Sequence, residues 1–382
     1  MEGKLKFLKY EYPEKPRWMQ SSVGPTVAEM LTDIRKYLEQ FSSFKDAAKQ
    51  NPPQYLDLLG KISVARRDLL LKYLLNVQQE EGIGVQDKET THQIMNAVDI
   101  EIKIENSPPL LEDFPSLECD ISSLDSNVMS KSVDETKNLY KAYTVLVSDT
   151  NETQEETDKQ EFKDCIGLLQ KELLTELHKV LMDGVMDEHS TSPGHFSTKR
   201  RVTKYHGADH EYPHFHTESI AEQTVEHLIN EYNGMLIEIK KAKIYDEKCL
   251  EMLFKCATSF LFTFLQLHPF ADGNGRLARL LGSYSLLTFS PFMTPIYNVF
   301  SKSSENDYID ALVEARRNLE SHPPIDDMNS GVKVVNTLLQ QEPRDLFAML
   351  VESNWTMWRQ FLIRLGDKSV VLFPWENHPT HI

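Results

Sequence analysis

The sequence is poor in cysteine and glycine and contains no long uninterrupted apolar run. Its four cysteines are scattered over 382 residues and none forms a Cys-x-x-Cys pair, which excludes a secreted disulfide scaffold and favours a reducing compartment. With only 15 glycines and 18 prolines, collagen-like and low-complexity classes are excluded as well. The amino terminus lacks the apolar core and small-residue cleavage site of a signal peptide. We therefore expect a cytosolic or nuclear protein.

Basic residues are also in deficit, because 41 Lys and Arg stand against 58 Asp and Glu, for a net charge of −17. Such a chain repels phosphate backbones, so we expect no nucleic-acid partner. The most apolar stretch, residues 249–267, is interrupted by Glu251, Lys255 and Gln266. It is interpreted as a buried helix and not as a bilayer span, so no membrane partner is expected.

Helical periodicity dominates what is present. Apolar residues at spacings of three and four predict helices over 27–41, with Thr26 as a start signal, over 62–82, ending near Gly82, and over 166–185. A further helix is predicted from an N-cap at Thr217 to about residue 240. Pro52 and Pro53 are predicted to end the preceding segment. Residues 200–207 predict an extended hairpin arm that turns near Gly207.

Twelve residues, 268–279, combine several chemically active side chains. They read His-Pro-Phe-Ala-Asp-Gly-Asn-Gly-Arg-Leu-Ala-Arg and lie between two apolar stretches, so we predict a helix, a loop and a helix. Proline at 269 moves His268 out of helical geometry to the mouth of the loop. Gly273 and Gly275 let backbone N–H groups converge beside the N-terminus of the second helix. This arrangement predicts an anion-binding nest.

The side chains around the predicted nest fit a polyphosphate and a proton acceptor. Arg276 and Arg279 stand three residues apart on one side of the helix, and Asn274 can donate to a phosphate oxygen. Asp272 offers a carboxylate oxygen, the ligand that Mg²⁺ prefers. His268, with an ordinary pKa of about 6.5, can accept a proton from an attacking hydroxyl. The combination predicts nucleotidyl or phosphoryl transfer.

The segment resembles the defining motif of the Fic family, His-Pro-Phe-x-Asp/Glu-Gly-Asn-Gly-Arg-x-x-Arg, with every fixed position present. The resemblance extends to residues 177–181, 193–196 and 308–316 and covers roughly 63–350. It implies a mainly α fold, the Fic helical bundle with a small β-hairpin flap. Residues 1–62 are then an N-terminal helical extension and residues 351–382 a C-terminal helix end and tail. The stretch at about 99–164, with 17 acidic residues against 6 lysines, is then an insertion.

The resemblance implies transfer of AMP from MgATP to a Ser, Thr or Tyr hydroxyl of a target protein. His268 is then the general base, and Asp272 holds Mg²⁺. The nucleotide phosphates are held by a set on the loop and the following helix: Gly273, Asn274, Gly275, Arg276 and Arg279. The flap would position the target segment by strand pairing. Its residues are Val202, Thr203, Lys204 and Tyr205.

Fic proteins are often restrained by a helix with the pattern Ser/Thr-x-x-x-Glu-Gly/Asn, whose glutamate pairs with the second motif arginine. Residues 77–82 match it at Glu81 and Gly82 but carry Val77 in place of the hydroxyl residue. An ordinary acid at a helix C-terminus is an equally weighted interpretation. If Glu81 pairs with Arg279, the γ-phosphate is displaced and transfer is slow. In some relatives this glutamate assists removal of AMP, so reversal of the modification also stays open.

Other functions remain open at this point. Four histidines and two acids lie within eleven positions and could bind zinc, although Pro213 interrupts any helix that would align them. They are His206, Asp209, His210, Glu211, His214 and His216. A partner-binding helical module without catalysis is a second alternative, and a Fic-type transferase with another nucleotide donor is a third. The oligomeric state, including a homodimer, is likewise left open.

Overall fold

A long apolar helix, α8 (Glu247–Leu267), runs through the middle of the molecule. The computed structural model describes residues 3–19, 24–105, 126–151, 166–186, 191–205, 207–242, 245–297, 304–317, 319 and 324–371. Within these ranges the chain is mainly α-helical with a two-stranded antiparallel hairpin, which confirms the predicted fold class. By length and apolar composition α8 could cross a membrane, yet 89% of its apolar window is buried inside the protein. It packs on α7 (Glu218–Lys240), α9 (Asn274–Leu286) and α12 (Arg344–Arg364).

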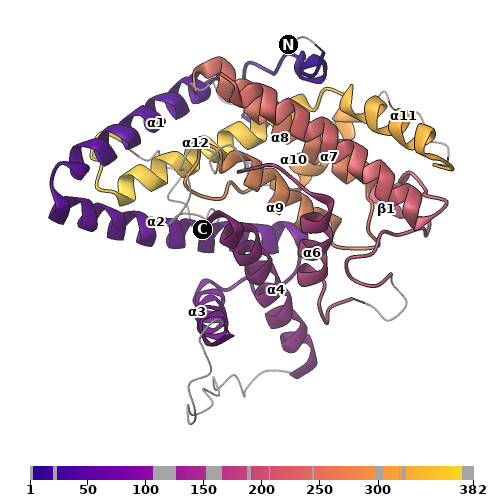
Figure 1. Ribbon diagram of the computed structural model, residues 1–382, viewed down its shortest axis with the longest axis horizontal. Helices are drawn as coiled ribbons and strands as arrows, with labels where there is room; N and C mark the ends of the chain where they lie inside the picture. Colours follow the sequence, from indigo (N-terminus) through magenta and orange to yellow (C-terminus); the bar gives the residue numbers. More distant parts are fainter. Residues whose placement is uncertain are drawn as a thin grey trace.

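Two long helices, α1 (Val27–Lys49) and α2 (Pro52–Glu81), form a V with α12 between its arms (Figure 1). The side chain of Thr26 accepts a hydrogen bond from the backbone of Glu29 and completes a capping box, as the start signal predicted. The preceding helix ends at Lys49, just before Pro52 and Pro53, as predicted, and both prolines also lie in the first turn of α2. Proline suits the first turn of a helix, where its missing N–H has no partner to lose.

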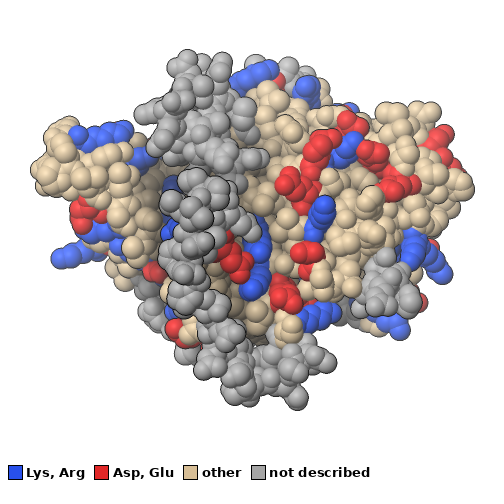
Figure 2. All heavy atoms as spheres, turned by 60° about the horizontal axis from the view of Figure 1, so that its bottom comes forward, with Lys and Arg blue, Asp and Glu red and all other residues tan. Residues whose placement is uncertain are grey.

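Helices α3 (Lys88–Glu105) and α4 (Ser126–Asn151) lie beside the C-terminal half of α2 (Figure 1). They occupy much of the predicted acidic insertion, whose segments 106–125 and 152–165 lie outside the described residues. On the face in Figure 2, acidic side chains stand beside Lys and Arg side chains, and the basic ones do not gather in one broad area. Helix α6 (Lys171–Leu181) is shorter than predicted, because residues 166–170 lie outside it and the backbone of Leu169 pairs with the Asn233 side chain.

The hairpin lies at the opposite end of the molecule from the V (Figure 1). Strands β1 (Val202–Tyr205) and β2 (Ala208–Glu211) pair from Val202 opposite Glu211 to Tyr205 opposite Ala208. Gly207 has φ +82°, a conformation that glycine adopts without strain, so the predicted turn is confirmed. The predicted N-cap of α7 is also confirmed, because the Thr217 hydroxyl accepts from the backbone of Ile220.

Three further elements complete the described fold: η1 (Lys6–Leu8), α10 (Ser304–Ala315) and α11 (Met328–Leu339). Residue 62 lies inside α2 and residue 350 inside α12, so the predicted domain boundaries do not coincide with helix ends. The buried side chains of α1, α2, α8, α9 and α12 belong to one hydrophobic cluster. The motif between α8 and α9 is therefore built directly onto this core.

Candidate active site

His268 is the residue that ends α8. It has φ +47° and is the only non-glycine residue with positive φ among the described residues, because Pro269 prevents the helix from continuing. Its Nδ1 donates to the Leu265 carbonyl at 3.4 Å, which leaves the Nε2 lone pair free to accept a proton. Burial, followed by the nearby Arg201 cation, lowers the pKa of His268 to about 3. The imidazole is therefore neutral at physiological pH.

The loop after His268, residues 268–274, is called the motif loop below. Its shape is held from inside by Asn274, whose Oδ1 accepts from the Phe270 backbone at 3.0 Å and whose Nδ2 donates back at 2.9 Å. Asn274 is 1% exposed. Both ends of its amide are thus used within the loop, where we had expected a direct donor to phosphate. The loop needs this pair because the polar backbone of the buried Phe270 would otherwise lack partners.

His178 on α6 clamps the motif loop from a distant part of the chain. Its Nδ1 accepts from the Gly194 backbone at 2.9 Å, so its Nε2 carries the proton and donates to the Asp272 carbonyl at 3.0 Å. The ring stacks on Phe270 with centroids 3.7 Å apart. Burial lowers the pKa of His178 to about 4. Sequence reasoning treated residues 177–181 only as a family landmark; a polar residue on the leucine-rich face of this helix was the available signal.

The Asp272 carboxylate stands at the open side of the loop. Its Oδ1 accepts from the Gly273 backbone at 2.6 Å, its Oδ2 lies 3.3 Å from Arg276, and the side chain is 64% exposed. No group of three or more His, Cys, Asp or Glu able to hold a metal ion occurs among the described residues. One exposed carboxylate beside a predicted phosphate site nevertheless fits Mg²⁺, which takes one or two protein oxygens and completes its shell with phosphate and water.

The two glycines of the motif serve different needs. Gly273 is the N-cap of α9 with φ +74°, a conformation that L side chains rarely adopt. Gly275 lies in the first turn of α9, where a Cβ atom would come within 2.6 Å of Oε1 of Glu81 and nearer still to Oε2. A carboxylate therefore sits directly on the helix N-terminus where the nest was predicted. Anions are stabilised at such an end by the exposed N–H groups and the helix dipole.

The motif arginines are both buried and have different partners. Arg276 is 6% exposed and faces Asp272, whereas Arg279 is 1% exposed and lies 2.8 Å from the Glu81 carboxylate. Arg279 also donates to the Ile296 carbonyl at 2.9 Å, and its guanidinium stands 4.3 Å from the Tyr308 ring centroid. Neither guanidinium projects into open solvent. The structure thus joins Glu81, 198 residues upstream, to the second motif arginine.

The end of α2 and the turn after it, residues 77–85, are called the strap. Val77 is fully buried in the core, which explains why an apolar residue stands where the family pattern has a hydroxyl. Hydrogen bonds to the strap come instead from α4 and, at the Val85 carbonyl, from the Thr91 hydroxyl of α3 at 3.0 Å. The Thr136 hydroxyl donates to Gln78 and accepts from the Val85 backbone, each at 2.9 Å, and Glu135 accepts from the Gly84 backbone at 2.8 Å. Sequence reasoning missed Glu135 and Thr136, because their 51-residue separation from the strap leaves no local pattern.

The predicted flap residues 202–205 form strand β1, and β2 covers only one of its edges. Val202 is 46% exposed, and no other described strand pairs with β1. The flap is attached to the motif by a hydrogen bond from the Ser197 backbone to the Pro269 carbonyl at 2.8 Å. His206 lies outside the described residues, and the remaining members of the histidine-rich segment form no metal-binding group there.

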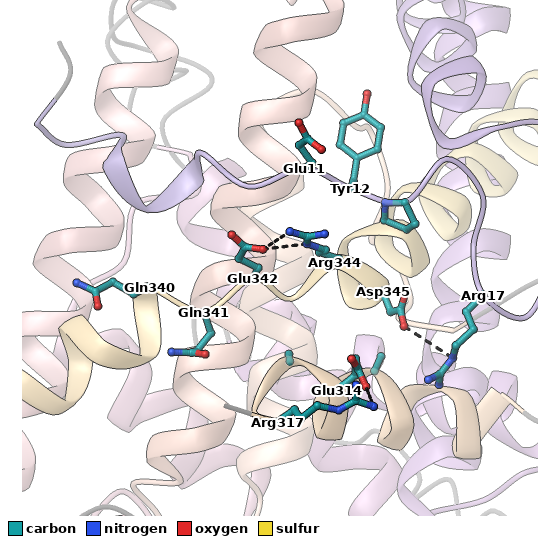
Figure 3. A pocket seen from close by; sticks show the side chains of 13 residues that line it. Glu11, Tyr12, Arg17, Glu314, Arg317, Gln340, Gln341, Glu342, Arg344 and Asp345 are labelled. Atoms are coloured by element: carbon teal, nitrogen blue, oxygen red, sulfur yellow. Dashed lines mark hydrogen bonds and ion pairs between the residues drawn. The ribbon is translucent and has the colours of Figure 1, made fainter. Parts of the chain in front are cut away.

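A separate cavity of about 890 Å³ lies between the N-terminal segment, α10 and the start of α12 (Figure 3). Its charged side chains pair with one another, as Arg17 does with Asp345 and Arg317 with Glu314. No residue of the 268–279 motif lines it. The cavity is therefore separate from the motif.

Comparisons with known proteins identify one family and two relatives that are similar to parts of this chain. The Fic/DOC family matches residues 168–286, a range that includes α6, the hairpin, α8 and the motif. A Fido domain-containing protein of Dictyostelium discoideum is 30% identical over 132 residues, which are 33% of this chain and 81% of that protein. The ribonucleoside-diphosphate reductase small chain of Ostreid herpesvirus 1 (isolate France) is 32% identical over 108 residues, 28% of this chain but only 17% of that protein's length.

Among solved structures, a Fic domain-containing signalling protein from Bacteroides thetaiotaomicron has a TM-score of 0.49 at 15% identity, over 85% of this chain and 97% of that one. The complete motif lies in the loop between α8 and α9 and the first turn of α9, within the range that the family matches. The Dictyostelium relative is covered over most of its own length. The family match and the Dictyostelium relative together show that the chain belongs to the Fic/DOC family, whose members are typically transferases.

Proposed function

We propose that this protein transfers AMP from MgATP to a Ser, Thr or Tyr hydroxyl of a target protein. The observation that carries the proposal is that one short loop joins a neutral imidazole to the N-terminus of α9, the helix that carries two buried arginines. The nest at Gly273 and Gly275, with Arg276 and Arg279, suits a polyphosphate. Asn274 contributes by holding the loop in shape.

In the proposed reaction the hydroxyl oxygen of the target attacks the α-phosphorus of ATP. The bond from this phosphorus to the oxygen bridging to the β-phosphate breaks, and pyrophosphate leaves. Nε2 of His268 accepts the hydroxyl proton, and the low pKa of the imidazole keeps it in the basic form. Asp272 would hold Mg²⁺, which neutralises charge on the phosphates when bound. The free edge of β1 would align the target segment as an added strand.

We further propose that Glu81 restrains this activity. Its carboxylate lies on Gly275 and Arg279, the positions that the phosphates of ATP would use. A carboxylate and a phosphate compete for the same N–H groups and the same cation, so productive binding requires the strap to move. Reversal of the modification through the same carboxylate remains part of this proposal.

The experiment is to incubate the purified protein with each Mg-nucleoside triphosphate in turn and to search by intact mass for a covalently added nucleotide. Wild type, Glu81→Gly and His268→Ala are compared. We expect an AMP adduct from ATP that is most abundant in Glu81→Gly and absent in His268→Ala. An adduct formed only from another triphosphate would show that this nucleotide is the donor in place of ATP, with the same transfer reaction. An equal adduct in His268→Ala, or none in any folded variant with any nucleotide, would overturn the proposal.

A further inference from the structure

Tyr212, the residue that follows β2, lies flat against the ring of His268. The two ring centroids are 3.9 Å apart and the planes differ by 10°. Tyr212 is 6% exposed. It belongs to neither the 268–279 motif nor the predicted flap residues. It therefore forms a side wall for the imidazole from another segment of the chain.

The backbone of Tyr212 is tied to the base of the hairpin. Its N–H donates to the Arg201 carbonyl at 3.0 Å. The buried Arg201 guanidinium joins the two ends of the hairpin, because it donates to the carbonyl of Ser197 at 2.8 Å and to that of Pro213. Ser197 in turn donates to Pro269, the neighbour of His268. Tyr212 thus stands on a support that is also attached to the motif loop.

The hydroxyl end of Tyr212 is held from the flap. It lies 3.1 Å from the hydroxyl of Tyr205, the last residue of β1. The Tyr205 ring is covered on one face by the guanidinium of Arg316, the residue directly after α10, at 4.2 Å from the ring centroid. Contacts therefore run without interruption from α10 through β1 to the imidazole.

The orientation of the His268 imidazole depends on the Tyr212 ring, because the imidazole's own hydrogen bond is weak. The bond from Nδ1 to Leu265 is 3.4 Å long, at the outer limit of a useful interaction. Rotation about χ2 would carry Nε2 away from the place where a hydroxyl approaches, and a parallel ring at 3.9 Å blocks that rotation. We propose that Tyr212 is a positioning residue that holds the His268 imidazole in its productive orientation, with Tyr205 and Arg316 holding Tyr212.

The proposal rests on the proposed function only for its consequence in catalysis. A purely structural Tyr212 would pack the base of the hairpin and leave His268 unaffected when replaced by another apolar residue. The two roles differ in whether a change at Tyr212 alters the ring-current shift and the pKa of the His268 imidazole. The charged or titratable groups that act on this ring are Arg201, Asp272 and His210, and the His210 ring also contacts Tyr212, with centroids 4.9 Å apart. Loss of the Tyr212 ring uncovers the imidazole, and burial is the main cause of its lowered pKa.

The experiment labels the histidines at Cε1 in the full-length chain and follows their ring signals by NMR, with His268 assigned by its absence in His268→Ala. In wild type we expect an upfield ring-current shift for His268 and no titration down to about pH 4. Tyr212→Leu should abolish the upfield shift and move the midpoint toward the ordinary value of about 6.5. Tyr212→Phe keeps the ring and should retain both signatures. If wild type lacks the shift, or if Tyr212→Leu retains it, the proposal is overturned.

The catalytic consequence is measured separately as self-modification in the Glu81→Gly background. Tyr212→Leu should lower kcat about 10-fold to 100-fold, because a general base contributes only when oriented, with little change in KM for ATP. Tyr212→Phe should stay within about 3-fold, a small part of what the base itself contributes. A higher KM with unchanged kcat would contradict positioning. If no variant forms an adduct while the NMR signatures change as expected, the proposed transfer fails and the placement of the imidazole by Tyr212 stands. The shift in wild type tests the contact even if Tyr212→Leu does not fold.

Discussion

The strap meets the start of α9, directly after the motif loop, at Gly275 and Arg279. The motif loop and the strap are nevertheless held by different kinds of contact. The motif loop is fixed by the Asn274 side chain within the loop and by His178 bonded to its backbone. The strap reaches the site through one ion pair and is held at its outer side by three hydrogen bonds with α4. Under the proposed function, this difference predicts that the motif loop is a permanent binding surface and that the strap is a removable cover. Changes to the first should damage the fold, and changes to the second should release activity.

The largest effect is expected inside the motif loop. Asn274→Ala leaves the Phe270 N–H and carbonyl without partners in a buried place and should lower the free energy of unfolding by about 2–4 kcal/mol. Urea denaturation of wild type and variant measures this. The control is Asn329→Ala, at an exposed position in the first turn of α11. A loss as small as that of the control would mean that the loop keeps its shape without the Asn274 amide.

The next prediction concerns His178 and pH. The pKa of this residue is about 4 in the folded protein and near 6.5 in the unfolded chain, so between these values only the unfolded chain takes up the proton. Neutral His178 therefore makes its full contribution to the free energy of unfolding above about pH 6.5. As the pH falls toward 4, proton uptake by the unfolded chain lowers the free energy of unfolding by about 2–3 kcal/mol. Unfolding free energies measured across this range should fall less steeply for His178→Gln than for wild type. Equal slopes would show that His178 titrates normally in the folded state.

The strap is tested by removing its carboxylate. Glu81→Gly frees Gly275 and Arg279 and should raise transfer about tenfold, the effect of about 1.4 kcal/mol. Glu81→Gln keeps the volume and should give a smaller rise. Both variants leave the buried Arg279 without its carboxylate and should have a lower Tm than wild type. MgATP should raise the Tm of the variants by more than it raises the Tm of wild type. Unchanged transfer together with an unchanged response to MgATP would show that Glu81 does not cover the site.

The smallest effect is expected at the outer side of the strap. Thr136→Val removes the hydroxyl that bonds to Gln78 and Val85 and should raise transfer about fivefold, the equivalent of about 1 kcal/mol. The matched control is Thr144→Val on the same helix, whose hydroxyl donates only to the carbonyl of Lys141. If both variants give the same rate of transfer, the hydrogen bonds with α4 do not hold the strap in place.

Features that depend on neighbouring residues were predictable. The caps at Thr26 and Thr217, the turn at Gly207 and the exit of His268 from its helix all follow from residues within four positions, and each is present. Features that depend on distant partners were not. The inward use of the Asn274 amide was missed, because it requires knowing that Phe270 is buried.

The order of residues alone determined the helical architecture, the hairpin and the loop with its imidazole and arginines, because helix periodicity, caps and glycine turns act over a few positions. Only the tertiary structure decided that Glu81 lies on Arg279, that His178 clamps the motif loop and that Tyr212 faces His268. These contacts join segments 56 to 198 residues apart. Their geometry is set by how whole helices pack around α8, which no short pattern encodes.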